Sequence, residues 1–249
     1  QVTATPASIN NIQLTLSSQV INQKTSYVFS FKPTSSLPST GTIYIYFPST
    51  IVLDVRSGPC LANSNLQGFS ASATCISDSS TLTIQSGFPS GYTGGTLLSI
   101  EVDNVKNPPS TQLPSTFAIE TWDNLKTSSG AVTDRASSLS LITSLTSGTI
   151  SGTDVLTVVN PTTGTPSLYT FSFVLTNSIL QGGYIQISLP SAVSIASSAS
   201  ISGTSGFVTT PSITVDTTTR SIEIKNGFTT AASSSSATLK FSISEITNP

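Results

Sequence analysis

The chain has 249 residues, a formal net charge of −2, no histidine and no methionine, and only 8% of its residues are charged. Without histidine it can form no Ser-His or Cys-His nucleophile pair and no imidazole metal site. Its nine lysines and arginines are scattered, so they form no basic stripe for nucleic-acid phosphates. Serine and threonine make up about a third of the chain, and this near-neutral, hydroxyl-rich composition favours folded β-structure over disorder.

Short stretches in which apolar residues alternate with polar ones predict β-strands. In one of them Ile43, Ile45 and Phe47 point one way, and Tyr44 and Tyr46 point the other way. Further stretches of this kind, separated by Gly, Pro, Asn and Ser turns, are Tyr27–Phe31, Leu82–Ile84, Ile100–Val102 and Phe117–Thr121. A period of two with one apolar face is typical of half-buried antiparallel strands, and the turn spacing indicates a β-sandwich.

Four of these blocks recur in the second half of the chain at a nearly constant offset of 140–142 residues. The recurring blocks, in order, are Tyr169–Phe173, Gly183–Pro190, Ile222–Ile224 and Phe241–Ile243, and they lead to Asn248-Pro249 as the first copy leads to Asn107-Pro108. This order and spacing indicate a tandem duplication. We therefore expect an all-β chain of two tandem antiparallel β-sandwich domains, at residues 1–134 and 135–249.

The second copy stops before the counterpart of its last strand. In the first copy the closing stretch Ser115–Asn124 follows Asn107-Pro108, whereas the second copy reaches Pro249 at that point. An open sandwich edge exposes unpaired N–H and C=O groups beside an apolar slot. We expect that either a longer natural chain or a strand donated by another polypeptide completes the second sandwich, with Gln1–Asn10 as the expected donor segment.

The two cysteines, Cys60 and Cys75, occur only in the first copy. A bridge between them would close a loop of about 15 residues and stabilise the fold by about 3 kcal/mol in the chain-entropy view. Two free buried thiols are the alternative. We expect the Cys60–Cys75 disulfide, which implies an oxidising compartment.

The repeat pattern resembles a known family. It is similar to the immunoglobulin-like repeats of very large extracellular proteins of ciliates and other protists, including mastigoneme-like proteins. The residues that carry the resemblance are Ile45-Tyr46-Phe47-Pro48, Cys60, Cys75, Gly94-Gly95, Asn107-Pro108 and Phe117-Ala118-Ile119-Glu120-Thr121. The match covers most of residues 26–125 and, without the cysteine pair, residues 168–249. It implies immunoglobulin-like domains in a surface or filament protein, often glycosylated on serine and threonine.

Three aromatic residues are candidates for an interface. Tyr44 and Tyr46 are expected on the exposed face of their strand, and Trp122, the only tryptophan, is expected at the domain junction. Such residues anchor protein interfaces and also stack on sugars. Nearby Glu120, Asp123 and Asn124 form either a plain polar junction or an oxygen-ligand Ca²⁺ site, and we expect the former.

Glycosylation is expected on hydroxyl groups rather than on asparagine. No Asn-x-Ser/Thr sequon is available, because Asn160 is followed by Pro161. The hydroxyl-rich segment next to two prolines offers candidate O-glycan acceptors at Thr162, Thr163 and Thr165.

No catalytic or nucleotide-binding motif occurs in the sequence, so we expect no catalytic residue, no cofactor and no metal. The expected function is a structural subunit or segment of an extracellular filament or cell-surface coat, built from end-to-end immunoglobulin-like domains. In one form of this hypothesis, strand donation joins the domains. The expected partners are other copies of the chain or further repeats, with glycans as a further candidate partner. The alternative is a carbohydrate-binding adhesin module. We expect an extracellular location, no nucleic-acid partner and no membrane span.

Overall fold

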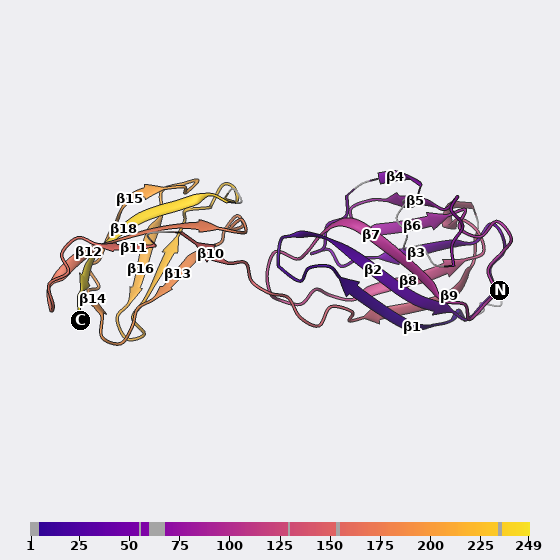
Figure 1. Ribbon diagram of the computed structural model, residues 1–249, viewed down its shortest axis with the longest axis horizontal. Coiled ribbons are helices and arrows are strands. Elements are labelled where there is room, and N and C mark those ends of the chain that lie inside the picture. Colours follow the sequence, from indigo (N-terminus) through magenta and orange to yellow (C-terminus); the bar gives the residue numbers. More distant parts are fainter. Residues whose placement is uncertain (1–4, 55, 60–67, 129, 153–154, 234–235) are drawn as a thin grey trace. The chain divides into compact units, whose positions relative to one another are not determined.

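The computed structural model describes residues 5–54, 56–59, 68–128, 130–152, 155–233 and 236–249. These residues form strands β1 to β18 and one 3₁₀ helix, η1 (Lys126–Ser128), which confirms the prediction of an all-β chain. The chain divides into two compact units, called here the N-terminal unit (Gln1–Ser147) and the C-terminal unit (Gly148–Pro249). Each unit is built from β-strands (Figure 1) and has its own hydrophobic core.

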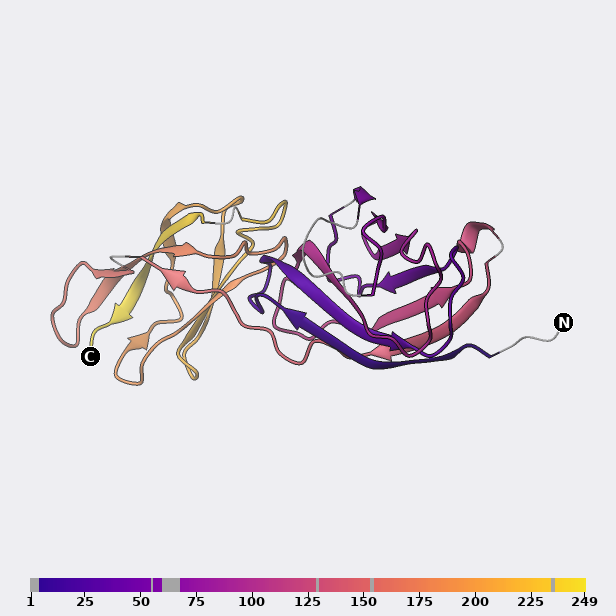
Figure 2. The same cartoon turned by 45° about the vertical axis from the view of Figure 1, so that its right-hand side comes forward.

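The N-terminal unit is an immunoglobulin-like sandwich of two sheets joined through one strand. Its strands are β1 (Ala7–Leu16), β2 (Lys24–Pro33), β3 (Thr42–Tyr46), β4 (Arg56–Pro59), β5 (Thr74–Ser77), β6 (Thr81–Gln85), β7 (Leu98–Lys106), β8 (Phe117–Trp122) and β9 (Val132–Leu139). One sheet has the order β1-β2-β7 and the other β4-β5-β6-β3-β8-β9. Strand β1 runs antiparallel to β2, as the two indigo strands in Figure 2 show, and its first residues run parallel to β9, so the predicted antiparallel sandwich contains a parallel pair of strands.

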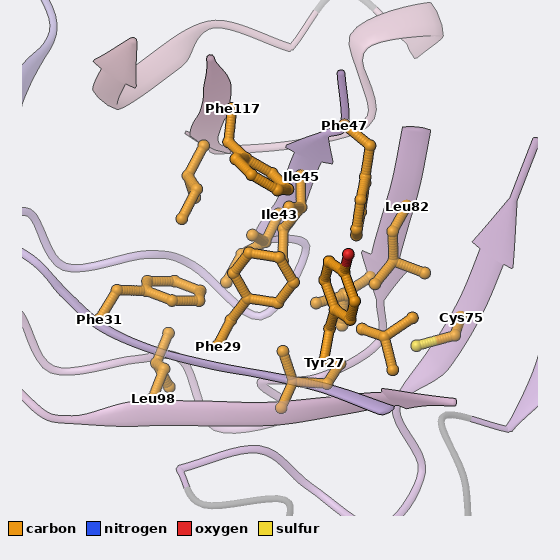
Figure 3. Close-up of a cluster of buried hydrophobic side chains, with 14 of the residues drawn as sticks. Tyr27, Phe29, Phe31, Ile43, Ile45, Phe47, Cys75, Leu82, Leu98 and Phe117 are labelled. Atoms are coloured by element: carbon orange, nitrogen blue, oxygen red, sulfur yellow. The ribbon is translucent and has the colours of Figure 1, made fainter. Parts of the chain in front are cut away.

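Alternating side chains of β2 and β3 build the core of the N-terminal unit, as their sequence period predicts. Tyr27, Phe29 and Phe31 on β2 are fully buried and point toward the opposite sheet (Figure 3). The ring of Phe29 meets Phe47 and Phe117 edge-on, with centroid separations of 5.5 and 5.9 Å. Edge-to-face aromatic pairs of this kind add about 0.5–1.5 kcal/mol each beyond the burial of their area.

The C-terminal unit repeats part of this plan. Its strands are β10 (Ile150–Ser151), β11 (Leu156–Val158), β12 (Pro166–Leu175), β13 (Ile185–Ser188), β14 (Ser194–Ile195), β15 (Ile201–Ser205), β16 (Ser212–Asp216), β17 (Ser221–Lys225) and β18 (Thr238–Thr247). Strands β12 and β18 form the centre of one sheet, with β10 and β11 on β12 and with β14 and β15 on β18. The second sheet has the order β13-β17-β16.

Strand register is the same in the two units. Phe29 lies opposite Ile100 in the β2–β7 pair, and Phe171 lies opposite Phe241 in the β12–β18 pair. Both pairs also contain a register shift at the same place, between Thr25 and Tyr27 in one and between Ser167 and Tyr169 in the other. The shift is accompanied by a left-handed residue in each partner strand, Asn104 with φ 57° and Glu245 with φ 58°. A shared β-bulge is a positional feature of the fold rather than a local accident.

The division between the two units falls at a different residue from the one that the sequence predicts. The boundary was expected at 134/135, inside a polar stretch, but the division lies at 147/148. The difference arises because Val132–Leu139 forms β9 and pairs with β8, and because Ile142 beyond it is still buried in the N-terminal core.

Part of the expected donor segment Gln1–Asn10 pairs within its own unit. Its residues from Ala7 onward belong to β1, where Ala7 lies opposite Asp134 and Ile9 lies opposite Pro33. Ile9 is buried in the core of its own unit. The described part of the segment thus completes its own sandwich, and the donation of a strand to another sandwich stays a prediction.

Only one of the two cysteines lies among the described residues. Cys75 lies in β5, is buried in the N-terminal core and is not a free cysteine. Its expected partner Cys60 lies outside the described residues, so the Cys60–Cys75 disulfide stays a prediction.

Candidate interaction surfaces

The three aromatic residues singled out from the sequence lie together on the N-terminal unit, on the face of β3 and β8 that points away from the core. Strand pairing brings them together, because Tyr44 lies opposite Glu120 and Thr42 opposite Trp122. The rings of Tyr44 and Tyr46 are stacked at 6.3 Å and 15°, and Trp122 meets Tyr44 edge-on at 6.0 Å. We call Tyr44, Tyr46 and Trp122 the outer aromatic cluster.

A lysine covers this cluster. The Lys126 ammonium lies over the rings of Tyr46 and Trp122, at 5.8 and 5.3 Å from their centroids. The backbone N–H of Lys126 also donates to the Tyr44 hydroxyl at 3.0 Å. Tyr44 is consequently buried, at 8% exposure, and the prediction that it lies on an exposed face is wrong. Lys126 belongs to η1, and nothing in the local sequence indicates that this segment folds back over β3.

The carboxylate of Glu120 is hydrogen-bonded to two members of this cluster. Its carboxylate accepts hydrogen bonds from the Tyr46 hydroxyl (2.9 Å), the Trp122 indole N–H (3.0 Å) and the Arg135 Nε (2.8 Å). Arg135 also forms an ion pair with it at 2.7 Å, and the Glu120 side chain is only 10% exposed. Burial alone would raise the pKa of Glu120, but the donors Trp122 and Tyr46 and the charge of Arg135 together hold it below its usual value.

The possible calcium ligands are occupied by the protein itself. The Asp123 carboxylate accepts from the Ala131 N–H at 2.7 Å, and the Asn124 side-chain oxygen accepts from the Leu125 N–H at 2.8 Å. Glu120 faces its own three donors. In the part of the chain that the structure describes, no group of three His, Cys, Asp or Glu residues could hold a metal ion.

Replacing Glu120 with glutamine is expected to destabilise the N-terminal unit by about 1–2 kcal/mol at neutral pH, because charge-assisted bonds become neutral ones and Arg135 is half-exposed. The folded-state pKa of Glu120 is lowered, so its stabilising effect is present above the unfolded value of about 4.3 and is lost as pH falls through the folded value. Urea unfolding at several pH values should show the difference between wild type and variant shrinking below about pH 4.

The matched control for this experiment is Glu223→Gln. Glu223 forms an ion pair with Lys225 on the surface of the C-terminal unit, where both side chains are substantially exposed. Such a pair contributes about 0.5 kcal/mol or less. A Glu120→Gln effect that matches the control, or that does not change with pH, would refute the role given to Glu120.

A second arrangement, absent from the predicted site residues, ties loops to the core in the N-terminal unit. The buried Tyr27 hydroxyl donates to the Asn107 side-chain oxygen at 2.8 Å. The Asn107 amide then donates to the backbone carbonyls of Ser18 (3.0 Å) and Val20 (2.8 Å). Burial raises the pKa of Tyr27, so the phenol keeps its proton and remains a donor. We call this pair of residues the Tyr–Asn lock.

The C-terminal unit contains the same lock. Tyr169 donates to Asn248 at 2.6 Å, and the Asn248 amide donates to the carbonyls of Asn160 (2.6 Å) and Thr162 (2.8 Å). The Asn-Pro dipeptides mark the end of each sequence repeat, and the structure gives their asparagines this shared task. Two buried side chains thus fix the loop before β2 in the N-terminal unit and the loop before β12 in the C-terminal unit.

The candidate glycan acceptors lie in that same loop. Thr162 and Thr163 are exposed, while Thr165 is half-buried and its hydroxyl donates to the Thr162 carbonyl at 2.6 Å. Exposure suits a modification site, but O-glycosylation at these residues stays a prediction.

The C-terminal unit also has a hollow beside the start of β13. A cavity of about 240 Å³ is lined by Gly182, Gly183, Tyr184, Lys225, Asn226, Phe228 and Thr229. Tyr184 is 54% exposed there. An exposed aromatic ring next to amide, ammonium and hydroxyl groups is a combination that can hold a small polar ligand.

Comparisons with known proteins find distant likenesses only. No family profile and no curated protein matches the sequence. Among solved structures, the C-terminal domain of the Streptococcus pyogenes antigen I/II-family protein AspA is 10% identical, with 96% of this chain and 92% of that chain covered and a TM-score of 0.30. The Streptococcus agalactiae serine-rich repeat protein Srr2 is 11% identical, with 97% and 85% covered and a TM-score of 0.30.

The collagen adhesin CNA from S. aureus is 14% identical, with 98% of this chain and 84% of that chain covered and a TM-score of 0.25. Similarities at these TM-scores carry no argument about ligands or location. None of the three is a ciliate or mastigoneme protein, so that family resemblance stays a prediction. Across the described ranges, no helix is long and apolar enough to cross a membrane.

Proposed function

We propose that the chain is a non-catalytic structural module of an extracellular surface coat or filament, made of immunoglobulin-like units arranged in series. The observation that carries this proposal is the repetition of one structural plan. The β2–β7 and β12–β18 pairs share their register, their bulge and their Tyr–Asn lock. Many cell-surface domains share this sandwich architecture.

The chemistry of the N-terminal unit supports a passive role. Glu120, the buried Asp134 and the outer aromatic cluster are all engaged in internal hydrogen bonds or ring contacts. Groups used in this way hold the fold and are not poised for proton transfer. We propose further repeats of the same kind as the partners and the outside of the cell as the location.

Immunogold electron microscopy of the cells that produce this chain tests the proposal. Antibodies raised against the purified chain are expected to label a regular surface layer or fibre at repeated intervals. Label confined to the cell interior, or spread over a surface without order, would overturn the proposal, as would substrate turnover by the purified protein.

A carbohydrate-binding adhesin module is the second candidate, and the hollow beside Tyr184 favours it. The outer aromatic cluster is a weaker platform than expected, because Lys126 covers two of its rings. A glycan array probed with the purified chain separates the two surfaces. Binding lost in Tyr184→Ala and kept in Trp122→Ala would place a sugar site at the hollow, and no binding by the wild type would exclude this candidate.

A further inference from the structure

In the N-terminal unit a short strand covers the outer edge of β5. Strand β4 pairs antiparallel with β5, where Gly58 lies opposite Cys75. On its other side β5 pairs with β6, where Cys75 lies opposite Ile84. The main chain of β5 therefore has a hydrogen-bonding neighbour on both sides, and β5 is an internal strand of its sheet.

Strand β16 takes the place of β5 in the C-terminal unit. Ile213 on β16 lies opposite Ile224 of β17, and Ile224 is the repeat equivalent of Ile84. The chain between β13 and β16 forms β14 and β15, and both of these strands pair with β18 in the other sheet. Among the described residues β16 therefore pairs with β17 alone. We call its other side, which corresponds to the side of β5 that β4 covers, the open edge of β16.

The open edge of β16 lacks the features that usually keep edge strands from pairing. Those features are lysine side chains, proline, β-bulges or a very short strand. The five residues Ser212–Asp216 include no lysine and no proline, they pair with β17 without a register shift, and none of them has a positive φ. The one charged residue of the strand, Asp216, lies at its end. An edge of this kind can bind another strand through main-chain hydrogen bonds.

The core-facing side chains of β16 also have apolar surface left to bury. Ile213 and Val215 pack against the core of the C-terminal unit but are only half-buried. At the equivalent positions of β5, Cys75 and Ser77 are 6% and 4% exposed. A further strand beside β16 would cover the two aliphatic side chains, and burial of apolar surface favours such an addition.

The sequence of β16 is complementary to itself when two copies run antiparallel. With Thr214 opposite Thr214 of the other copy, each Ile213 lies opposite Val215, and each Ser212 lies opposite Asp216. Apolar residues thus meet β-branched apolar residues and threonine meets threonine, which are favourable cross-strand pairs. The two Asp216 carboxylates lie at opposite ends of the pair, about 13 Å apart along the strands, so screening by salt removes most of their repulsion.

We propose that the open edge of β16 binds the same edge of a second copy of the chain, antiparallel and centred on Thr214. The two three-stranded sheets then join into one sheet of six strands, in the order β13-β17-β16-β16-β17-β13. A twofold axis relates the copies, so each contact is made twice. A pair of five-residue strands is smaller than a standard interface of about 1,600 Å², so the dimer has a dissociation constant between about 1 μM and about 1 mM. This inference goes beyond the proposed function, which arranges units in series, because it joins separate chains to one another.

Sedimentation velocity of the purified chain tests the pairing. A monomer–dimer equilibrium is expected between about 1 μM and about 1 mM chain. Thr214 is exposed, so Thr214→Lys leaves the fold intact but places two ammonium groups directly opposite each other at the centre of the dimer. This variant is expected to dimerise at least about tenfold more weakly, because like charges in opposed cross-strand positions repel. A wild-type chain that stays monomeric over this range, or a Thr214→Lys dimer as tight as that of the wild type, would overturn the proposal.

A mixture of oppositely charged variants tests the register. Thr214→Glu alone is expected to weaken the dimer as Thr214→Lys does, whereas the two variants together bring opposite charges into contact. The mixture is expected to dimerise at least about tenfold more tightly than either variant alone, and added salt is expected to reduce this gain. No gain in the mixture would overturn a pairing centred on Thr214.

Gln186 provides the matched control. It is exposed and lies in the same cross-strand row as Thr214, because both residues lie opposite Glu223, but it belongs to β13 and is two strands away from the open edge. Gln186→Lys and Gln186→Glu are expected to dimerise as the wild type does, with circular dichroism showing that all four variants fold. An effect at Gln186 equal to that at Thr214 would overturn the proposal.

Hydrogen exchange locates the contact independently of the variants. Amides of β16 that point away from β17 are expected to exchange more slowly as the protein concentration rises through the dissociation constant. Amides of β5 are expected to exchange at the same rate at every concentration, because β4 already pairs with β5. Exchange at β16 that does not change with concentration would overturn the proposal. A β16 dimer formed by a chain that labels no ordered surface structure would refute the proposed function and leave the pairing standing.

Discussion

Replacing Asn107 with alanine is expected to destabilise the N-terminal unit by about 3–4 kcal/mol, since each buried polar group left without a partner costs about 1–3 kcal/mol. The substitution removes the acceptor of the buried Tyr27 hydroxyl and the donor to the Ser18 and Val20 carbonyls. Asn107 is 1% exposed, so water cannot replace these bonds without local opening. Urea unfolding followed by tyrosine and tryptophan fluorescence measures the loss.

Two further variants show whether the lock or a general loss of side chain is responsible. Tyr27→Phe removes one hydrogen bond and keeps the ring, so a smaller loss of about 1–2 kcal/mol is expected, and a double-mutant cycle with Asn107→Ala should show strong coupling. Asn10→Ala is the control, because Asn10 is exposed and its amide donates only to the Thr34 hydroxyl. Additive effects of Tyr27→Phe and Asn107→Ala would contradict the lock.

The long strands of both units could be predicted because their burial follows the two-residue period of their sequence. After its exposed first residue, strand β2 alternates buried and half-buried positions, and β12 has the same pattern at the equivalent positions. The repeat therefore predicted that these strands occur in both units, but it did not predict which strands pair. The Asn-Pro dipeptides were visible as the ends of the repeats, but the task of the asparagines was not, because their contacts lie about 80–90 residues away in the chain.

Strand β9 shows where hydrophobic patterning fails. The sequence of Val132–Leu139 has few large apolar residues, and its fully buried side chain is the carboxylate of Asp134. That carboxylate is held by the Thr121 hydroxyl at 2.8 Å and the Ser35 N–H at 3.0 Å. A strand whose buried position is polar and satisfied by hydrogen bonds has no apolar alternation, so the sequence placed a domain boundary there.

The outer aromatic cluster was predicted only in part, because Trp122 was expected at the domain junction and not beside the two tyrosines. The period of β3 puts Tyr44 and Tyr46 on one face, and the pairing of β3 with β8, which the sequence did not show, brings Trp122 next to them. The covering residue comes from η1, whose position depends on the turn after β8 and not on any periodicity. Tertiary contacts made by a short loop of this kind have no signature in a single sequence.

Replacing Phe29 with alanine is expected to cost the N-terminal unit about 4–5 kcal/mol, whereas Phe171→Ala, the equivalent change in the C-terminal unit, is expected to cost about 3 kcal/mol. The cost of a large-to-small change rises with the volume of the cavity that it leaves, and Phe29 is enclosed more completely. It is fully buried between Phe47 and Phe117, while Phe171 is 9% exposed.

The difference between these two variants measures what the Phe117 ring of β8 contributes to the enclosure of Phe29, because β8 has no counterpart among the described residues of the C-terminal unit. Urea unfolding with probes in each unit gives the two free energies. A Phe171→Ala cost equal to or above that of Phe29→Ala would contradict this reasoning.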